Sequence, residues 1–138
     1  MTRILVCGGR DFPSDNTYRW LVDNLEFEIK KVIPTFKEIT LLIEGGAKGA
    51  DLGASRLAVM RPLPHLTIPA QWEKYGKVAG VIRNKRMLEE GKPDVAIAFP
   101  GGPGTKNMIE LLQIAGIPII FPYLMEKKDA NIPTLPGL

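Results

Sequence analysis

The stretch RILVCGG, residues 3–9, decides the fold class of this 138-residue chain. Its first part is mostly apolar at successive positions, which predicts a strand buried on both faces of a parallel sheet, and a glycine pair follows. The same pattern recurs in ITLLIEGG, residues 39–46, and in DVAIAFPGG, residues 94–102. HLTIPA, residues 65–70, and IPIIF, residues 117–121, predict two further strands.

Segments with apolar residues at helical spacing separate these strands. We predict a helix that Ser14 or Asp15 caps and that ends before Pro34, and helices from about Ala50 to Met60, from Val78 to Gly91 and from Thr105 to Ala115. Strand and helix therefore alternate, which predicts an α/β fold with a doubly wound, mainly parallel sheet of about five strands and helices on both faces. We assign residues 1–121 to one domain and residues 122–138, with prolines at 122, 133 and 136, to a C-terminal tail.

The composition limits the classes of function. The formal net charge of +3 permits anionic partners without requiring them. The single cysteine, Cys7, cannot form an internal disulfide, and with the single histidine, His65, it argues against a zinc centre. Neither metal nor resident cofactor is implied. No apolar run approaches the ~18 residues of a membrane span and no signal peptide is visible, so we expect a cytoplasmic protein, in a cell or an infected host.

Three glycine pairs each follow a predicted strand, and they are Gly8-Gly9, Gly45-Gly46 and Gly101-Gly102. Because the carboxyl ends of parallel strands share one edge, we expect these turns to converge where open α/β sheets bind ligands. Glycine lets backbone approach a ligand closely, and the N–H groups of a helix start favour phosphate. GGAKGAD lacks the P-loop spacing and CGGRDF is not G-x-G-x-x-G, so the motifs predict only an anion site.

Charged residues near the first two pairs allow functional and structural interpretations. Arg10 can pair with phosphate, and Asp11 can accept ribose hydroxyls or cap its turn. Lys48 can meet a phosphate or lie in solvent. Asp51 lies in the first turn of a predicted helix, where it either stabilises the helix dipole or binds a ligand hydroxyl.

The third pair and the stretch before it add further candidates. Thr105 can cap its helix and donate its hydroxyl to an anion. Arg83, next to Asn84, either reaches a bound anion or lies on a solvated helix face. Trp72 and Tyr75 lie over a nucleobase or serve packing. Cys7 and His65 are interpreted as structural residues.

Four motifs, taken in order, resemble the SLOG superfamily and its YspA/YpsA-like branch, many members of which are encoded by bacteria and phages. These motifs are CGGRDF at 7–12, EGGAKGAD at 44–51, W..YG..AG..RN..M over 72–87 and PGGPGT at 100–105. The resemblance covers residues 1–121 and implies a Rossmann-like fold. It also implies a nucleotide or nucleotide-derived ligand, including NAD- or ADP-ribose-related molecules, and our first interpretation is a protein that senses this ligand.

The pattern and the resemblance together predict one ligand site. Its residues are Gly8, Gly9, Arg10, Asp11, Gly45, Gly46, Lys48, Asp51, Arg83, Asn84, Gly101, Gly102, Gly104 and Thr105.

Two groups of relatives suggest alternative functions. The LOG phosphoribohydrolases, which cleave N-glycosidic bonds, resemble this chain but continue PGG-x-GT-x-x-E, whereas Met108 stands at the glutamate position here. Glu110 lies about 200° around the helix and cannot substitute, so a carboxylate would have to come from Asp11 or Asp51.

The DNA-processing protein DprA also contains this fold and binds single-stranded DNA. A phosphate backbone would suit the basic cluster Lys74, Lys77, Arg83, Lys85, Arg86 and Lys92, or these residues form a solvated helix face. We further expect a homo-oligomer, because apolar residues are left over on the helices and relatives often self-associate.

Overall fold

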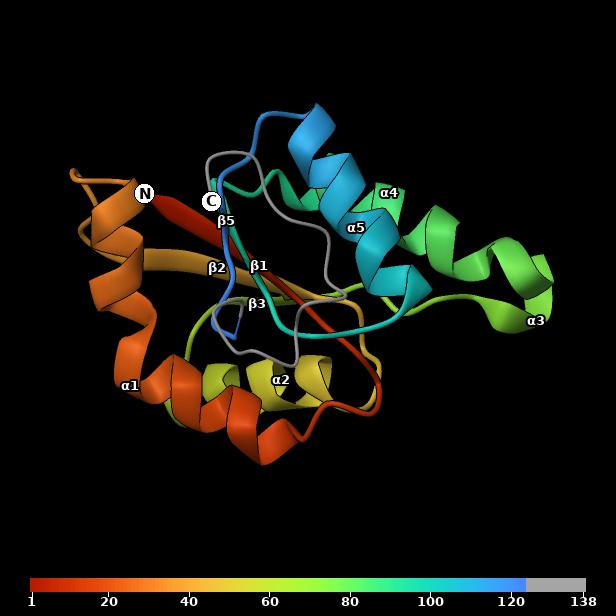
Figure 1. Cartoon of the computed structure of the whole chain (residues 1–138), viewed down its shortest axis with the longest axis horizontal. Coiled ribbons are helices and arrows are strands. Elements are labelled where there is room, and N and C mark those ends of the chain that lie inside the picture. The colour runs from red at the N-terminus through yellow and green to blue at the C-terminus, as the bar shows by residue number, and fades with distance from the viewer. Residues whose placement is uncertain (124–138) are drawn as a thin grey trace.

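Five parallel strands form the centre of the protein, whose computed structural model describes residues 1–123 (Figure 1). The strands are β1 (Thr2–Cys7), β2 (Ile39–Glu44), β3 (His65–Thr67), β4 (Val95–Ala98) and β5 (Ile119–Ile120). They pair in the order β3-β2-β1-β4-β5, and every pairing is parallel. The structure therefore confirms the predicted α/β fold. The predicted tail lies outside the described residues from residue 124 onward.

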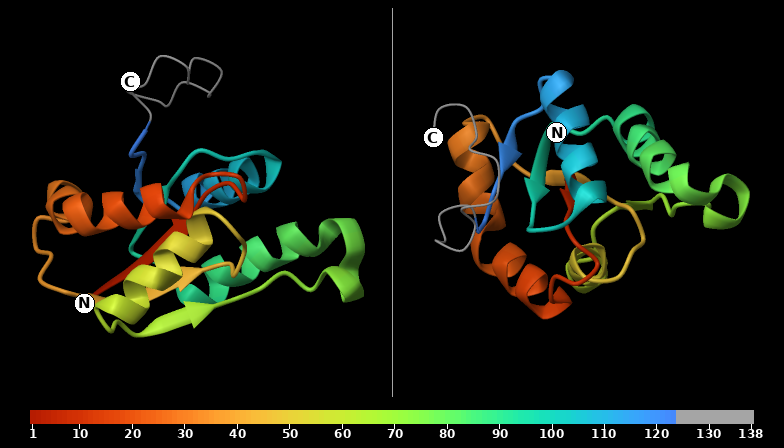
Figure 2. Two further views of the ribbon diagram at one scale, coloured as in Figure 1. Left: turned by 90° about the horizontal axis from the view of Figure 1, so that it is seen from below. Right: turned by 45° about the vertical axis from the view of Figure 1, so that its right-hand side comes forward.

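Two helices cover each face of the sheet. On one face α1 (Ser14–Val32) packs against α2 (Ala50–Met60), and on the other α4 (Ala79–Gly91) packs against α5 (Pro103–Ile114). A short helix, α3 (Trp72–Tyr75), and a 3₁₀ turn, η1 (Gly76–Val78), precede α4. This α3–η1 segment projects from the body in each view (Figures 1 and 2). No helix within residues 1–123 is long and apolar enough to cross a membrane.

Successive side chains of β1 point to opposite faces of the sheet, and both faces are buried, which explains why its sequence is apolar at successive positions. Ile4 and Val6 lie in the core beneath α1 and α2, whereas Leu5 and Cys7 lie in the core beneath α4 and α5. All four side chains are buried. A strand buried on both faces must occupy the centre of the sheet, as β1 does between β2 and β4.

The strand order places a reversal of winding beside β1. The chain moves outward from β1 through β2 to β3, then returns through α4 to β4 on the other side of β1. Consequently the loops after β1 and β4 lead to helices on opposite faces of the sheet. Ligands of open α/β sheets bind at such a point, outside the carboxyl ends of the strands.

The elements differ from the prediction mainly at their ends. β3 ends at Thr67 rather than continuing to residue 70, since Pro69 has no N–H to donate to a ladder. The final helix begins at Pro103, with Gly102 rather than Thr105 at its N-cap. α5 ends at Ile114, and Ala115, the last residue of the predicted helix, is its exposed C-cap.

Candidate functional site

The three glycine loops converge at the carboxyl edge of the sheet, as the sequence predicted. The Gly9 N–H donates to the Pro100 carbonyl at 2.8 Å, which joins the first loop to the third. The Ala50 N–H donates to the Gly9 carbonyl at 3.2 Å, which joins the first loop to the second. The β1–α1 loop is therefore bonded to both of its neighbours.

At most glycines of the first two loops, other protein atoms occupy the space where a Cβ would lie. Gly49 has φ of 72°, and a Cβ there would collide with the carbonyl oxygens of Gly9 and Arg10. A Cβ on Gly8 would lie 2.6 Å from the Ala50 Cβ, and one on Gly45 would collide with the Arg83 guanidinium. These glycines are required because loops and side chains press against them.

The start of α5 is open by comparison. A Cβ added to Gly102 or Gly104 would meet nothing within 4 Å. Gly102 is the N-cap, and no side chain caps the helix. Thr105, predicted as a possible cap, lies in the first turn with its side chain buried against Gly101. Pro103 has no N–H, and no side chain caps the N–H groups of Gly102, Gly104 and Thr105. These groups and the positive end of the helix dipole therefore suit an anion.

The Arg83 guanidinium points from α4 toward this edge. Its Nη1 donates to the Gly45 carbonyl at 2.6 Å, and its Nε donates to Asn84 Oδ1 at 2.9 Å. Arg83 is therefore fixed against the second loop, and the alternative of a fully solvated helix face is wrong. Its Nη2 makes no hydrogen bond to any residue among 1–123, so two N–H donors stay available.

Asn84 is buried between α4 and α5 and positions both of them. Its Nδ2 donates to the Gly104 carbonyl at 3.0 Å and to Asn107 Oδ1 at 2.9 Å, while its Oδ1 accepts from Arg83. Both amide donors are thus used within the protein. We interpret Asn84 as a residue that orients Arg83 and the start of α5, rather than as the direct ligand contact that the sequence suggested.

A buried carboxylate beneath the second loop was missed by the sequence analysis. Glu44, only 1% exposed, accepts from the Gly46 N–H at 2.6 Å and from the Thr67 hydroxyl at 2.5 Å. Its Oε2 also lies 2.8 Å from His65 Nε2. The network holds the Gly45-Gly46 turn and gives His65 the structural role that was predicted. The available signal was a carboxylate at the end of an otherwise apolar strand.

Asp51 is a second buried carboxylate, 6% exposed, in the first turn of α2. Burial raises its pKa to about 7, and the charge of Glu44 adds to the rise, whereas the hydrogen bond from the Ala47 N–H and the charge of Arg83 oppose it. Asp51 Oδ2 accepts that N–H at 3.1 Å. The helix dipole alone therefore does not account for Asp51.

The nearby Cys7 thiol is expected to be unreactive. Burial, strengthened by the charge of Asp51, raises the pKa of Cys7 well above its usual range. A thiol that stays protonated is a poor nucleophile and metal ligand. Residues 1–123 contain no group of three His, Cys, Asp or Glu side chains that could hold a metal ion.

Other charged candidates are less well placed. Arg10, Asp11 and Lys48 lie exposed on the first two loops and form no ion pair with another residue of the described chain.

The predicted basic cluster divides, because its members do not share one surface. Arg83 turns inward, and Arg86 pairs with Glu90 at 2.7 Å. Lys92 lies at the far end of α4. The exposed Lys74 and Lys77 lie on the projecting α3–η1 segment, and the exposed Lys85 lies within α4.

Comparisons with known proteins identify the family of this chain. Residues 2–75 match the sequence model of the YspA, cpYpsA-related SLOG family, a range that includes the first two glycine loops. The Gene 61 protein of Mycobacterium phage D29 is 38% identical over 129 residues, covering 87% of this chain and 95% of the phage protein. No solved structure matches the chain.

Proposed function

The chain belongs to the YspA, cpYpsA-related SLOG family, and on that premise we propose that it binds a nucleotide or nucleotide-derived ligand at the glycine-rich edge of its sheet. Family membership indicates a nucleotide-related function in general; the ligand class proposed is that of NAD and ADP-ribose. The observation that carries the proposal is the fixed Arg83 guanidinium, with Nη2 available, which Asn84 links to the uncapped start of α5.

Both elements suit a phosphate group. A guanidinium N–H and the amides of a helix start are strong donors to phosphate oxygens. Asn84 bonds to both Arg83 and the Gly104 carbonyl, so it fixes the Arg83 guanidinium relative to the amides at the start of α5. A preorganised set of donors loses little entropy when it binds an anion.

The buried charges favour one orientation of the ligand. Glu44 and Asp51 lie under the second loop, so an anion above that loop would meet two carboxyl groups. The third loop has no acidic residue in the first turn of its helix. We therefore place the phosphate at the start of α5 and the less charged part of the ligand toward the first loop.

A thermal-shift panel with NAD, ADP-ribose and nucleoside monophosphates tests the proposal. A ligand present at 100 times its Kd should stabilise the wild-type chain by about 2.7 kcal/mol. Arg83→Ala should abolish the shift, whereas the control Arg86→Ala, on the exposed side of the same helix, should retain it. Absence of a shift with every compound, or an unchanged shift in Arg83→Ala, would contradict ligand binding at this edge.

A second candidate function is hydrolysis of the N-glycosidic bond of a nucleotide, and one observation favours it. Asp51 is a carboxyl group near Arg83 that can hold or release a proton at neutral pH, since its pKa is about 7. Met108, by contrast, is buried in the core beneath α5 and has no acid–base group. Release of free base that disappears in Asp51→Asn would support an enzyme; full recovery of intact nucleotides would remove this function for the substrates tested.

Self-association, cytoplasmic residence and oligonucleotide binding stay predictions. Apolar side chains are exposed on separate helices, including Phe27, Met60 and Ile114. Sedimentation would measure the predicted homo-oligomer, and cell fractionation the location. Single-stranded oligonucleotide binding is less favoured, because the predicted basic cluster divides; salt-sensitive binding at low ionic strength would restore it.

A further inference from the structure

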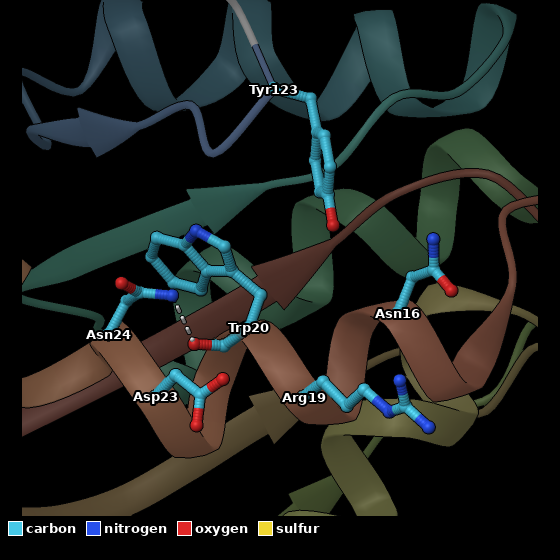
Figure 3. A pocket seen from close by; sticks show the side chains of 6 residues that line it. All are labelled: Asn16, Arg19, Trp20, Asp23, Asn24 and Tyr123. Carbon is cyan, nitrogen blue, oxygen red and sulfur yellow. Dashed lines mark hydrogen bonds between the residues drawn. The ribbon is translucent and has the colours of Figure 1, made fainter.

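A hollow of about 290 Å³ lies beside the glycine edge, between α1 and the residues that follow β5 (Figure 3). It is lined by Asn16, Arg19, Trp20, Asp23, Asn24 and Tyr123. Its volume lies just below the ~300–1,000 Å³ range of ligand pockets, so it suits one ring system rather than a whole nucleotide.

The aromatic walls of the hollow are held in place from behind. The Trp20 ring meets Phe99 edge-on, with centroids 5.7 Å apart. The Tyr123 ring lies 5.2 Å from Phe12 and 6.2 Å from Phe99. Rings fixed in this way offer a π-face or edge to a flat ligand at little entropic cost.

Polar groups surround these rings. The Asn24 Nδ2 donates to the Trp20 carbonyl at 3.1 Å, which leaves the amide oxygen as an acceptor. Arg19 and Asp23 are one helical turn apart, yet neither forms an ion pair with any residue of 1–123. The hollow thus combines aromatic walls with donors and acceptors, which is the chemistry that a nucleobase edge requires.

The hollow and the glycine edge share one loop. Phe12, which contacts Tyr123, belongs to the loop whose Gly9 N–H bonds to the Pro100 carbonyl. Asn16 lies in the first turn of α1, where that loop ends. A ligand above Gly9 can therefore extend along the loop toward Asn16.

We propose that this hollow binds the nucleobase of the ligand whose phosphate lies at the start of α5. The inference rests on the proposed function. It assigns Trp20 and Tyr123 to contact with the base and the polar groups of α1 to recognition of its edge. Base recognition would then occur on one face of the sheet and phosphate binding on the other, across the reversal beside β1.

Isothermal titration of the full chain with the four common nucleoside monophosphates and with ribose 5-phosphate tests the proposal. At least one nucleotide should bind about tenfold or more tightly than ribose 5-phosphate, the effect expected of one base–aromatic contact. In the double variant Asn16→Ala/Asp23→Ala, which changes two exposed side chains, this preference should shrink while ribose 5-phosphate affinity stays unchanged. Glu26→Gln, also exposed on α1 but outside the hollow, should behave like wild type.

Fluorescence gives an independent readout. Trp72→Phe leaves Trp20 as the single indole of the chain, and the preferred nucleotide should change its emission whereas ribose 5-phosphate should not. Equal affinities for ribose 5-phosphate and all four nucleotides, or a preference unaffected by the double variant, would overturn the base subsite and leave the phosphate site intact. Binding of none of these compounds would overturn both.

Discussion

The second and third glycine loops, residues 45–49 and 101–104, are similar in sequence but differ in what surrounds their glycines. In the second loop, a Cβ on Gly45 or Gly49 would collide with a guanidinium or a neighbouring carbonyl. In the third loop, Gly101 packs against Thr105 and Gly9, but Gly102 and Gly104 have open space around them. The comparison teaches that glycine serves two purposes at one edge: it lets protein segments pack closely, or it leaves backbone N–H groups accessible to a ligand.

The largest expected effect is on the packed loop. Gly49→Ala should lower the free energy of unfolding by about 2–4 kcal/mol, because the methyl group adds left-handed backbone strain to a collision with the Gly9 carbonyl. Urea denaturation measures the change. If the variant unfolds at the wild-type midpoint, the second loop is not packed as described.

A pH dependence should come from Asp51. Its pKa is about 7 in the folded protein against an ordinary 3.8, so between these values the folded state holds a proton that the unfolded state has lost. The contribution of Asp51 to stability should therefore fall as pH rises from about 4 to about 7, by at most about 1.4 kcal/mol per pH unit.

The comparison of wild type with Asp51→Asn isolates this contribution. The stability of wild type relative to Asp51→Asn should decline over that pH range, as measured by urea denaturation at each pH. Asp15→Asn serves as the control for replacing an exposed carboxylate by an amide. A stability difference between wild type and Asp51→Asn that does not vary with pH would show that Asp51 titrates normally.

Glu44→Gln should have an intermediate effect on the second loop. The amide keeps an acceptor for the Gly46 N–H but places an NH₂ group among donors, so we expect a loss of about 1–3 kcal/mol. Exposed Glu38→Gln should change stability little. Amide hydrogen exchange at Gly46 should accelerate in Glu44→Gln only; equal exchange in both variants would remove Glu44 from the support of this loop.

The smallest effect, of opposite sign, belongs to the open loop. Gly104→Ala should raise stability by about 0.5–1 kcal/mol, since alanine is a better helix former and its methyl group meets nothing within 4 Å. The same urea denaturation measures it. A loss as large as that of Gly49→Ala would mean that the third loop is as tightly packed as the second.

Much of the fold could be predicted because its signals are local. α2 runs from Ala50 to Met60 as predicted, with Pro62 as the signal that ends it. The site could be predicted only in part, since its contacts join distant positions. Arg83 and Gly45 are 38 residues apart. Glu44 meets Thr67 because β2 and β3 place them opposite each other in register.

Sequence patterns also do not report what fills the space beside a glycine. The pairs at 45–46 and 101–102 look equivalent, yet a Cβ on Gly45 would collide with the Arg83 guanidinium, whereas one on Gly102 would meet open space. The hollow at Trp20 and Tyr123 joins α1 to residues beyond β5, so no local motif marks it.

The most direct test of the account is an amide chemical-shift titration of the ¹⁵N-labelled full chain with ADP-ribose. The account predicts the largest saturable shifts at the amides of Gly102, Gly104 and Thr105, with smaller shifts at Gly45 and Gly49. The same titration of Arg83→Ala should lose them. Saturable shifts confined to another surface, or none at the start of α5, would contradict the claim that the third glycine loop holds the phosphate.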